Sequence, residues 1–149
     1  KLNKVPESFA LSPKLEGLLQ KRLQAVERGY GIDWANAEAL AFASVLTEGA
    51  PIRLSGQDSG RGTFSQRHSV LVDTLTGEKY TPLNALESRQ APFAVFDSLL
   101  SEAGVLGFEY GYSLAQPHGM VLWEAQFGDF VNNAQSIIDL FIASGETKW

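Results

Sequence analysis

The hydrophobic positions at the start of the chain recur at helical spacing. Between the start signal Ser12-Pro13 and Gly29, leucine and valine recur every three or four residues, with charged residues between them. The run over residues 33–48 is rich in alanine and leucine, and Asp33 is a good N-cap for it. The pattern therefore predicts two helices that each pack one face on a core.

Shorter apolar runs, bounded by turn residues, predict strands. The predicted strands are residues 52–55, 70–73, 93–97 and 120–125, and the further predicted helices are residues 101–115 and 130–144. Strands and helices thus alternate, which is typical of an α/β fold. We expect three layers, with a largely parallel sheet flanked by helices.

The remaining segments predict connections. The turn signal at 76–78 favours a small hairpin over residues 70–83, and residues 84–92 read as a polar connector. Gly145 is the expected end of the last helix.

Composition restricts the possible functions. With 12 basic and 17 acidic residues, the formal net charge is −5, so neither a nucleic-acid partner nor a basic membrane patch is expected. The chain has no cysteine, which excludes disulfides and thiolate metal sites, and no apolar run long enough to cross a bilayer. It also starts without methionine and stops directly after the last predicted helix. We therefore expect a fragment of a longer protein.

Residues 101–130 hold the first group of candidate site residues. Glu102 begins a predicted helix, where the helix dipole favours negative charge, and the hydroxyl of Ser101 is a candidate N-cap. Phe127 and Phe130 come just after a predicted strand. A carboxylate at a helix start and aromatic residues just past a strand end could form a pocket; the alternative is a helix-start charge and ordinary core residues.

A second group lies in the polar loop after the first strand. The loop carries three glycines together with Gln57, Arg61, Arg67 and His68. Ligands bind beyond the carboxyl ends of strands in parallel α/β sheets. The loop matches neither a dinucleotide fingerprint nor a P-loop, so it predicts no phosphate site. We expect a functional loop, and the alternative is a solvated surface loop.

Four stretches carry a resemblance to a known family: GIDWANAEALAF, RLSGQDSGRGTFSQRH, DSLLSEAGVLGFEYGYS and LWEAQFGDFVNNAQSIIDLFIASGETKW. They resemble the thiamine-diphosphate-dependent, decarboxylating component of 2-oxoglutarate dehydrogenase. The resemblance implies a transketolase-like pyrimidine-binding domain over residues 31–149, incomplete at its C-terminus, after a lead-in and linker helix over residues 1–30. It also implies that Mg²⁺ and the diphosphate of the cofactor are bound by a domain outside this chain, and that a second copy of the chain completes a homodimer.

The resemblance also implies roles for individual residues. The carboxyl of Glu102 would bond a ring nitrogen of the aminopyrimidine and favour its imino tautomer, so that the exocyclic nitrogen becomes a base. Phe127 would pack on the pyrimidine face, with Phe130 as a further pocket wall. Gln57 and His68 would be catalytic. Arg61 and His68 are available for the distal carboxylate of the substrate.

The implied activity is decarboxylation of 2-oxoglutarate and transfer of the succinyl group to a lipoyl-bearing succinyltransferase, a step of the tricarboxylic acid cycle. The implied location is the bacterial cytoplasm, or the mitochondrial matrix if the protein is eukaryotic. This piece alone should be inactive. Two alternatives stay open: a carboligase or a dehydrogenase component for another 2-oxo acid, and a non-catalytic regulatory or interaction domain. Arg61 and Arg67 could also pair with acidic neighbours and only hold their loop.

Overall fold

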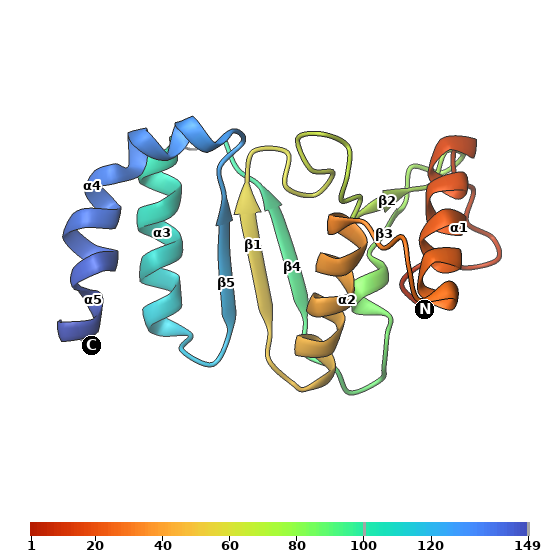
Figure 1. Ribbon diagram of the computed structural model, residues 1–149, viewed down its shortest axis with the longest axis horizontal. Coiled ribbons are helices and arrows are strands. Elements are labelled where there is room, and N and C mark those ends of the chain that lie inside the picture. Colours follow the sequence, from red (N-terminus) through yellow and green to blue (C-terminus); the bar gives the residue numbers. More distant parts are fainter. Residues whose placement is uncertain (100, 149) are drawn as a thin grey trace.

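The computed structural model describes residues 1–99 and 101–148, and a parallel sheet lies at its centre (Figure 1). Within these residues the sheet has three strands in the order β4-β1-β5. The strands are β1 Ile52–Gly56, β4 Phe93–Asp97 and β5 Met120–Glu124. β1 pairs in parallel with both neighbours, with Ile52 opposite Phe93 and Met120. The carboxyl ends of all three strands therefore meet at one edge of the sheet.

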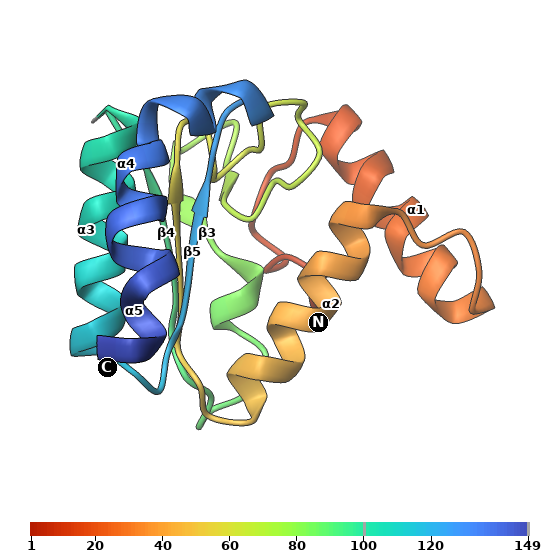
Figure 2. The ribbon, with the colours of Figure 1, turned by 60° about the vertical axis from the view of Figure 1, so that its left-hand side comes forward.

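Helices cover both faces of this sheet (Figure 2). Helix α2 (Trp34–Thr47) packs on one face, with α1 (Pro13–Arg28) beyond it, and α3 (Glu102–Ala115) packs on the opposite face. The prediction of a three-layer α/β fold with a largely parallel sheet is confirmed.

Two of the three predicted N-caps form their side-chain bonds. The Ser12 hydroxyl accepts from the Leu15 amide at 3.5 Å, and the Asp33 carboxylate accepts from the Asn36 amide at 2.7 Å. Ser101 has the extended backbone of a cap, but its side chain makes no capping bond. The Ser101 hydroxyl was therefore wrongly predicted to satisfy an amide of the first turn of α3.

The main hydrophobic core lies between α2 and the sheet. Phe42 and Leu46 of α2 pack against Ile52 and Leu54 of β1. The core also takes in residues from 83–93, namely Leu83, Leu86, Ala91 and Phe93.

The prediction that residues 84–92 are a polar connector is wrong in part. Leu86 and Ala91 are buried. Asn84 is the last residue of the short helix η1 (Pro82–Asn84), and its side chain donates to the Phe93 carbonyl and accepts from the Phe93 amide. The polar side chain of Asn84 thus satisfies backbone hydrogen-bonding groups at the end of the segment, which allows the segment to pack closely on the core.

The predicted hairpin is present and shorter than expected. Strands β2 (Leu71–Val72) and β3 (Lys79–Tyr80) pair antiparallel, with Leu71 opposite Tyr80. The carboxylate of Asp73 accepts from the amides of Leu75 and Thr76 and so closes the turn.

The prediction of a single α-helix over residues 130–144 is correct only in part, because the segment is helical throughout but its type of turn changes along the chain. The segment is a 3₁₀ stretch η2 (Gly128–Ala134), one turn α4 (Gln135–Ile137), a π stretch η3 (Ile138–Ile142) and α5 (Ala143–Lys148), which continues past Gly145. Glycine and two adjacent asparagines in η2 are poor helix formers, which favours the tighter start. The later turns pack on α3, where Ile137 lies against Gly107 and the Phe141 ring lies 6.2 Å from the Tyr110 ring.

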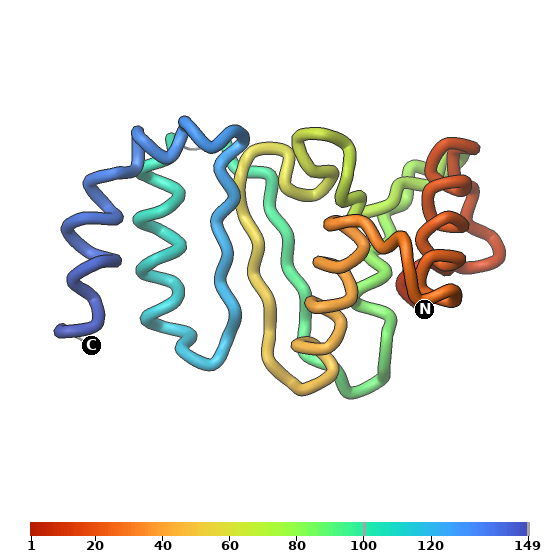
Figure 3. Tube along the Cα trace, viewed as in Figure 1, coloured from red at the N-terminus to blue at the C-terminus, as the bar shows by residue number. Residues whose placement is uncertain are grey.

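The N-terminal segment packs on the rest of the chain, while the two ends of the chain lie far apart (Figure 3). The Ala10 amide donates to the Asp73 carboxylate at 2.9 Å, and the Phe9 ring lies 5.8 Å from the Tyr80 ring. Among the described residues, no helix combines the length and apolar character needed to cross a membrane.

Candidate functional site

A hollow lies at the carboxyl ends of the strands, where α3 begins. It is small, with a cavity volume of about 10 Å³, and is partly open to solvent. We call it the strand-end hollow. Its lining residues are Gly56, Gln57, Ser98, Glu102, Val105, Trp123, Glu124, Ala125 and Gln126. The structure thus brings together Gln57 and Glu102, which are 45 positions apart in the sequence.

Gly56 allows the ends of β1 and β5 to approach each other here. Its φ is +152°, and a Cβ at this position would lie 2.2 Å from the Glu124 carbonyl oxygen. A side chain would therefore push the two strand ends apart. Because Gly56 has no side chain, the ends of β1 and β5 can meet where they line the hollow.

Glu102 is the first residue of α3 and is partly exposed. Its Oε2 accepts a long hydrogen bond of 3.4 Å from Asn133 Nδ2. The carboxylate lies at the positive end of the helix dipole, which stabilises its charge. Because this long bond is its contact among the residues that the structure describes, the carboxylate is available to a donor that enters the hollow.

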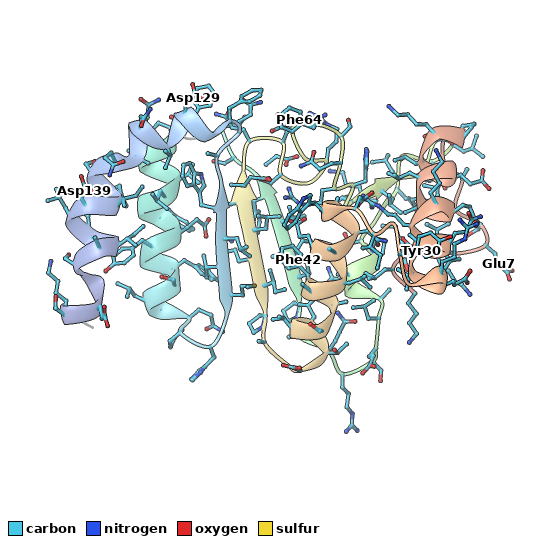
Figure 4. The ribbon with its side chains drawn as sticks, in the orientation of Figure 1. Glu7, Tyr30, Phe42, Phe64, Asp129 and Asp139 are labelled. Atoms are coloured by element: carbon cyan, nitrogen blue, oxygen red, sulfur yellow. The ribbon has the colours of Figure 1, made fainter. Side chains whose placement is uncertain are left out.

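Aromatic rings gather beside this site. Phe127 is 47% exposed, and its ring lies edge-on to the Phe64 ring at 5.7 Å and 6.2 Å from the Phe130 ring. Figure 4 shows Phe64 on the loop beyond the carboxyl end of the sheet. Phe64 and Phe127 are exposed, so either ring can offer its flat apolar face to a heterocycle.

The loop over residues 56–68, here called the site loop, is fixed by Arg67. This arginine is 8% exposed and bonds two carboxylates, Glu38 of α2 and Glu124 of β5, each with two nitrogen–oxygen contacts of 2.6–3.0 Å. Burial lowers its pKa, but the hydrogen bonds to Glu124 and Glu38 outweigh burial and raise the pKa above the ordinary value. Arg67 is therefore a positive charge that is held in place beside Glu124, a residue that lines the strand-end hollow.

Comparison with known proteins then identifies the family. Residues 30–149 match the family described as "Transketolase, pyrimidine binding domain". The chain belongs to this family. Over all 149 residues it is 60% identical to the 2-oxoglutarate dehydrogenase E1 component of Rickettsia conorii, 59% to that of Rickettsia felis and 56% to that of Brucella anthropi. It spans about 15–16% of the length of these relatives.

In this pyrimidine-binding domain, His68 does not line the strand-end hollow. It lies at another hollow, between α1 and α2, that Arg22 and Asn36 also line. Burial lowers the pKa of His68, and the charges of Arg22, Arg61 and Lys14 lower it further against the opposing backbone hydrogen bond at Ser65. The imidazole is therefore mainly neutral at neutral pH. Its N–H can donate a hydrogen bond to a carboxylate, but it offers no fixed charge.

Arg61 is exposed and makes contacts within its own loop. Its Nη2 lies 3.1 Å from Asp58 Oδ2, and its Nη1 donates to the Ser65 hydroxyl at 3.0 Å. The expectation that this arginine pairs with an acidic neighbour is confirmed, as is the same expectation for Arg67. These contacts are at the surface, so a substrate carboxylate could replace them at low cost.

Sequence reasoning missed the aromatic residue of the site loop and the identity of the acidic partners of Arg67. Phe64 is apolar within a polar, glycine-rich loop, and that contrast was the available signal. The bonds of Arg67 to Glu38 and Glu124 join residues 29 and 57 positions away, and no local pattern announces them. No cluster of three or more metal-binding side chains occurs in the part of the chain that the structure describes.

Proposed function

We propose that this chain is the pyrimidine-binding part of a thiamine-diphosphate-dependent component that decarboxylates 2-oxoglutarate. The observation that carries the proposal is the carboxylate of Glu102 at the start of α3, in one hollow with Gln57 and beside the exposed ring of Phe127. The printed names of the 56–60% identical relatives support the choice of substrate. Because the chain spans a small share of those relatives, the activity belongs to a longer polypeptide.

The residues present fit the aminopyrimidine of thiamine diphosphate. An aminopyrimidine is flat, apolar on its faces and rich in hydrogen-bonding groups on its edge. The strand-end hollow offers the carboxylate of Glu102 for the edge, and Phe127 and Phe130 offer rings for a face. When bound, the cofactor supplies an electron sink for the electrons released as a 2-oxo acid loses carbon dioxide.

With the cofactor bound, Glu102 would be the residue that holds a proton against a ring nitrogen of the pyrimidine. Its place at the helix start stabilises the carboxylate, and its long contact to Asn133 is weak enough to be given up. The chemistry that the cofactor would supply there is a basic exocyclic nitrogen, and the part of Glu102 would be to place a proton at the ring nitrogen. This makes Glu102 the acid–base residue that this chain contributes.

The remaining residues act on the substrate. Gln57 follows β1 in the same hollow as Glu102, where its amide can donate to the reacting carbonyl oxygen or carboxylate. Arg61 supplies positive charge for the distal carboxylate. His68, as a mainly neutral imidazole, supplies hydrogen bonds to the same distal carboxylate. Because His68 does not line the strand-end hollow, the substrate must reach across the site loop to meet it.

The partners are inferred from the family to which the relatives belong. The succinyl group passes to the lipoyl group of an acyltransferase, and a second copy of the chain completes a homodimer. Another domain of the longer polypeptide binds Mg²⁺ and the diphosphate. We place the protein in the bacterial cytoplasm, in keeping with the bacterial relatives.

Steady-state kinetics on the full-length protein test this function. The expected result is carbon dioxide release from 2-oxoglutarate that depends on thiamine diphosphate and Mg²⁺, with succinyl transfer to a lipoyl acceptor. A higher kcat/KM for pyruvate or 2-oxoadipate than for 2-oxoglutarate would show that the preferred substrate is that other 2-oxo acid. Products joined to an added aldehyde, with no lipoyl transfer, would make the protein a carboligase. No turnover together with no cofactor binding would support a regulatory or interaction domain.

A further inference from the structure

We propose that Arg67 is a positioning residue that holds the site loop against the sheet, so that Gln57 stays beside Glu102. The expected effect of Arg67 on turnover rests on the proposed function. The effect of Arg67 on the site loop can be measured without it. Arg67 does not line the strand-end hollow. Its action is therefore through the residues that it holds.

The guanidinium is bonded on every side. Nε donates to Glu38 Oε1 at 2.6 Å and Nη2 to Glu38 Oε2 at 3.0 Å. Nη1 donates to Glu124 Oε2 at 2.6 Å and Nη2 to Glu124 Oε1 at 2.8 Å. Nη1 also donates to the Ser59 carbonyl at 2.8 Å. Such paired, charge-assisted bonds fix both the angle and the position of the partners, which a point charge such as lysine cannot reproduce.

These bonds join three parts of the site. Glu38 belongs to α2, on one face of the sheet, and Glu124 ends β5 and lines the strand-end hollow. The Ser59 carbonyl lies in the site loop, two residues after Gln57. Arg67 therefore sets the distance between the loop that carries Gln57 and the strand end beside Glu102.

The site loop needs such support because its backbone is strained. Asp58, Ser65 and His68 have positive φ values of 56°, 53° and 51°, and no other non-glycine residue in the described part of the chain does. Such a backbone conformation is unfavourable for a residue with a side chain and persists only where its surroundings hold it. Arg22 of α1 adds support by donating to the carbonyls of Gln66 and Arg67.

The guanidinium also separates two carboxylates. With Arg67 removed, Glu38 and Glu124 would face each other with no cation between them, and like charges in a partly buried site repel. A variant that removes the positive charge therefore has two effects, namely repulsion and loss of the fixed geometry. Removing the two negative charges as well separates these effects.

Three variants of the full-length protein test the role: R67M, R67K and the neutral triple variant R67M/E38Q/E124Q. Arg89→Met, at an exposed arginine in the segment after η1, is the control. We expect R67M to speed amide hydrogen exchange over residues 60–69 by at least about tenfold, because local opening becomes easier. The exchange of α3 should stay unchanged.

Turnover gives the second measurement. We expect R67M to lower kcat by roughly 10²-fold, as a small misplacement of an active-site group does. The triple variant should regain the wild-type melting temperature but not the turnover, since the repulsion is gone and the geometry is still lost. R67K should recover part of the kcat, and R89M should match the wild type in both measurements.

Unchanged exchange over residues 60–69 in R67M would overturn the proposal. So would full turnover in the triple variant, because Arg67 would then only neutralise charge. Should the wild-type protein fail to decarboxylate 2-oxoglutarate, the proposed function fails, and the exchange measurement still decides whether Arg67 holds the loop.

Discussion

Arg53 of β1 and Glu109 of α3 form an ion pair in which Arg53 Nε lies 2.7 Å from Glu109 Oε2. The Glu109 side chain is 4% exposed and that of Arg53 is 18% exposed. The guanidinium also lies 4.2–5.2 Å from the ring centres of Phe96, Phe108 and Tyr112. The pair thus joins the helix that begins with Glu102 to the strand that leads into Gln57.

Removal of one partner of this pair should destabilise the fold strongly. We expect Glu109→Gln to lower the free energy of unfolding by about 3 kcal/mol, because it leaves the guanidinium without its counter-charge in a mainly buried position. The double variant R53M/E109M should recover most of this loss, since neither charge is then buried. Urea unfolding monitored by tryptophan fluorescence measures both. A double variant as unstable as the single one would show that the rings around Arg53, not the ion pair, hold the helix.

Phe127 and Phe42 should respond to alanine in opposite ways. Phe127 is 47% exposed, whereas Phe42 is 6% exposed and lies in the core between α2 and the sheet (Figure 4). Phe127→Ala should weaken binding of thiamine diphosphate about tenfold, which corresponds to the upper range for an aromatic contact, with little change in melting without cofactor. Phe42→Ala should cost about 3–5 kcal/mol of stability. Isothermal titration and thermal melting separate the two effects. Equal losses of apo stability would assign Phe127 to the core.

Asp73 should make stability depend on pH in the acid range. The backbone amides of Ala10, then Thr76 and Leu75, hold the pKa of its carboxyl below the usual value. A lowered folded pKa adds stability above the unfolded value of about 3.9, and this stability is lost as pH falls through the folded pKa. The stability difference between the wild type and Asp73→Asn should therefore be constant from pH 7 to 5 and shrink below about pH 4. Urea unfolding across this range checks it, with exposed Asp129→Asn as the control. A difference that is the same at pH 3 and pH 7 would contradict the role of the carboxylate.

Much of the fold followed from local signals that act over a few residues. Ser12, Gly29 and Asp33 marked the helix ends correctly because caps depend on neighbouring amides and on a left-handed residue. The short apolar runs located all three strands of the parallel sheet. The rule that ligands bind beyond parallel strands pointed to the loop that carries Gln57, and the structure adds Glu102 to the same hollow.

The misses came from contacts between distant segments. Apolar spacing over residues 130–144 did not distinguish 3₁₀, α and π turns, since packing on Gly107 and Tyr110 of α3 selects among them. The segment 84–92 looked polar because its apolar residues are sparse, yet the core needs Leu86 and Ala91.

The central claim is that Glu102 is the acid–base group that this chain gives to the cofactor. Turnover of 2-oxoglutarate by Glu102→Gln in the full-length protein tests it most directly, with cofactor binding and melting measured on the same sample. The fold does not depend on this carboxylate, because it is partly exposed and its contact to Asn133 is long. The account predicts that kcat falls by about 10²–10⁴-fold, the usual size of an acid–base contribution, while the melting temperature is unchanged. Turnover near that of the wild type would contradict it.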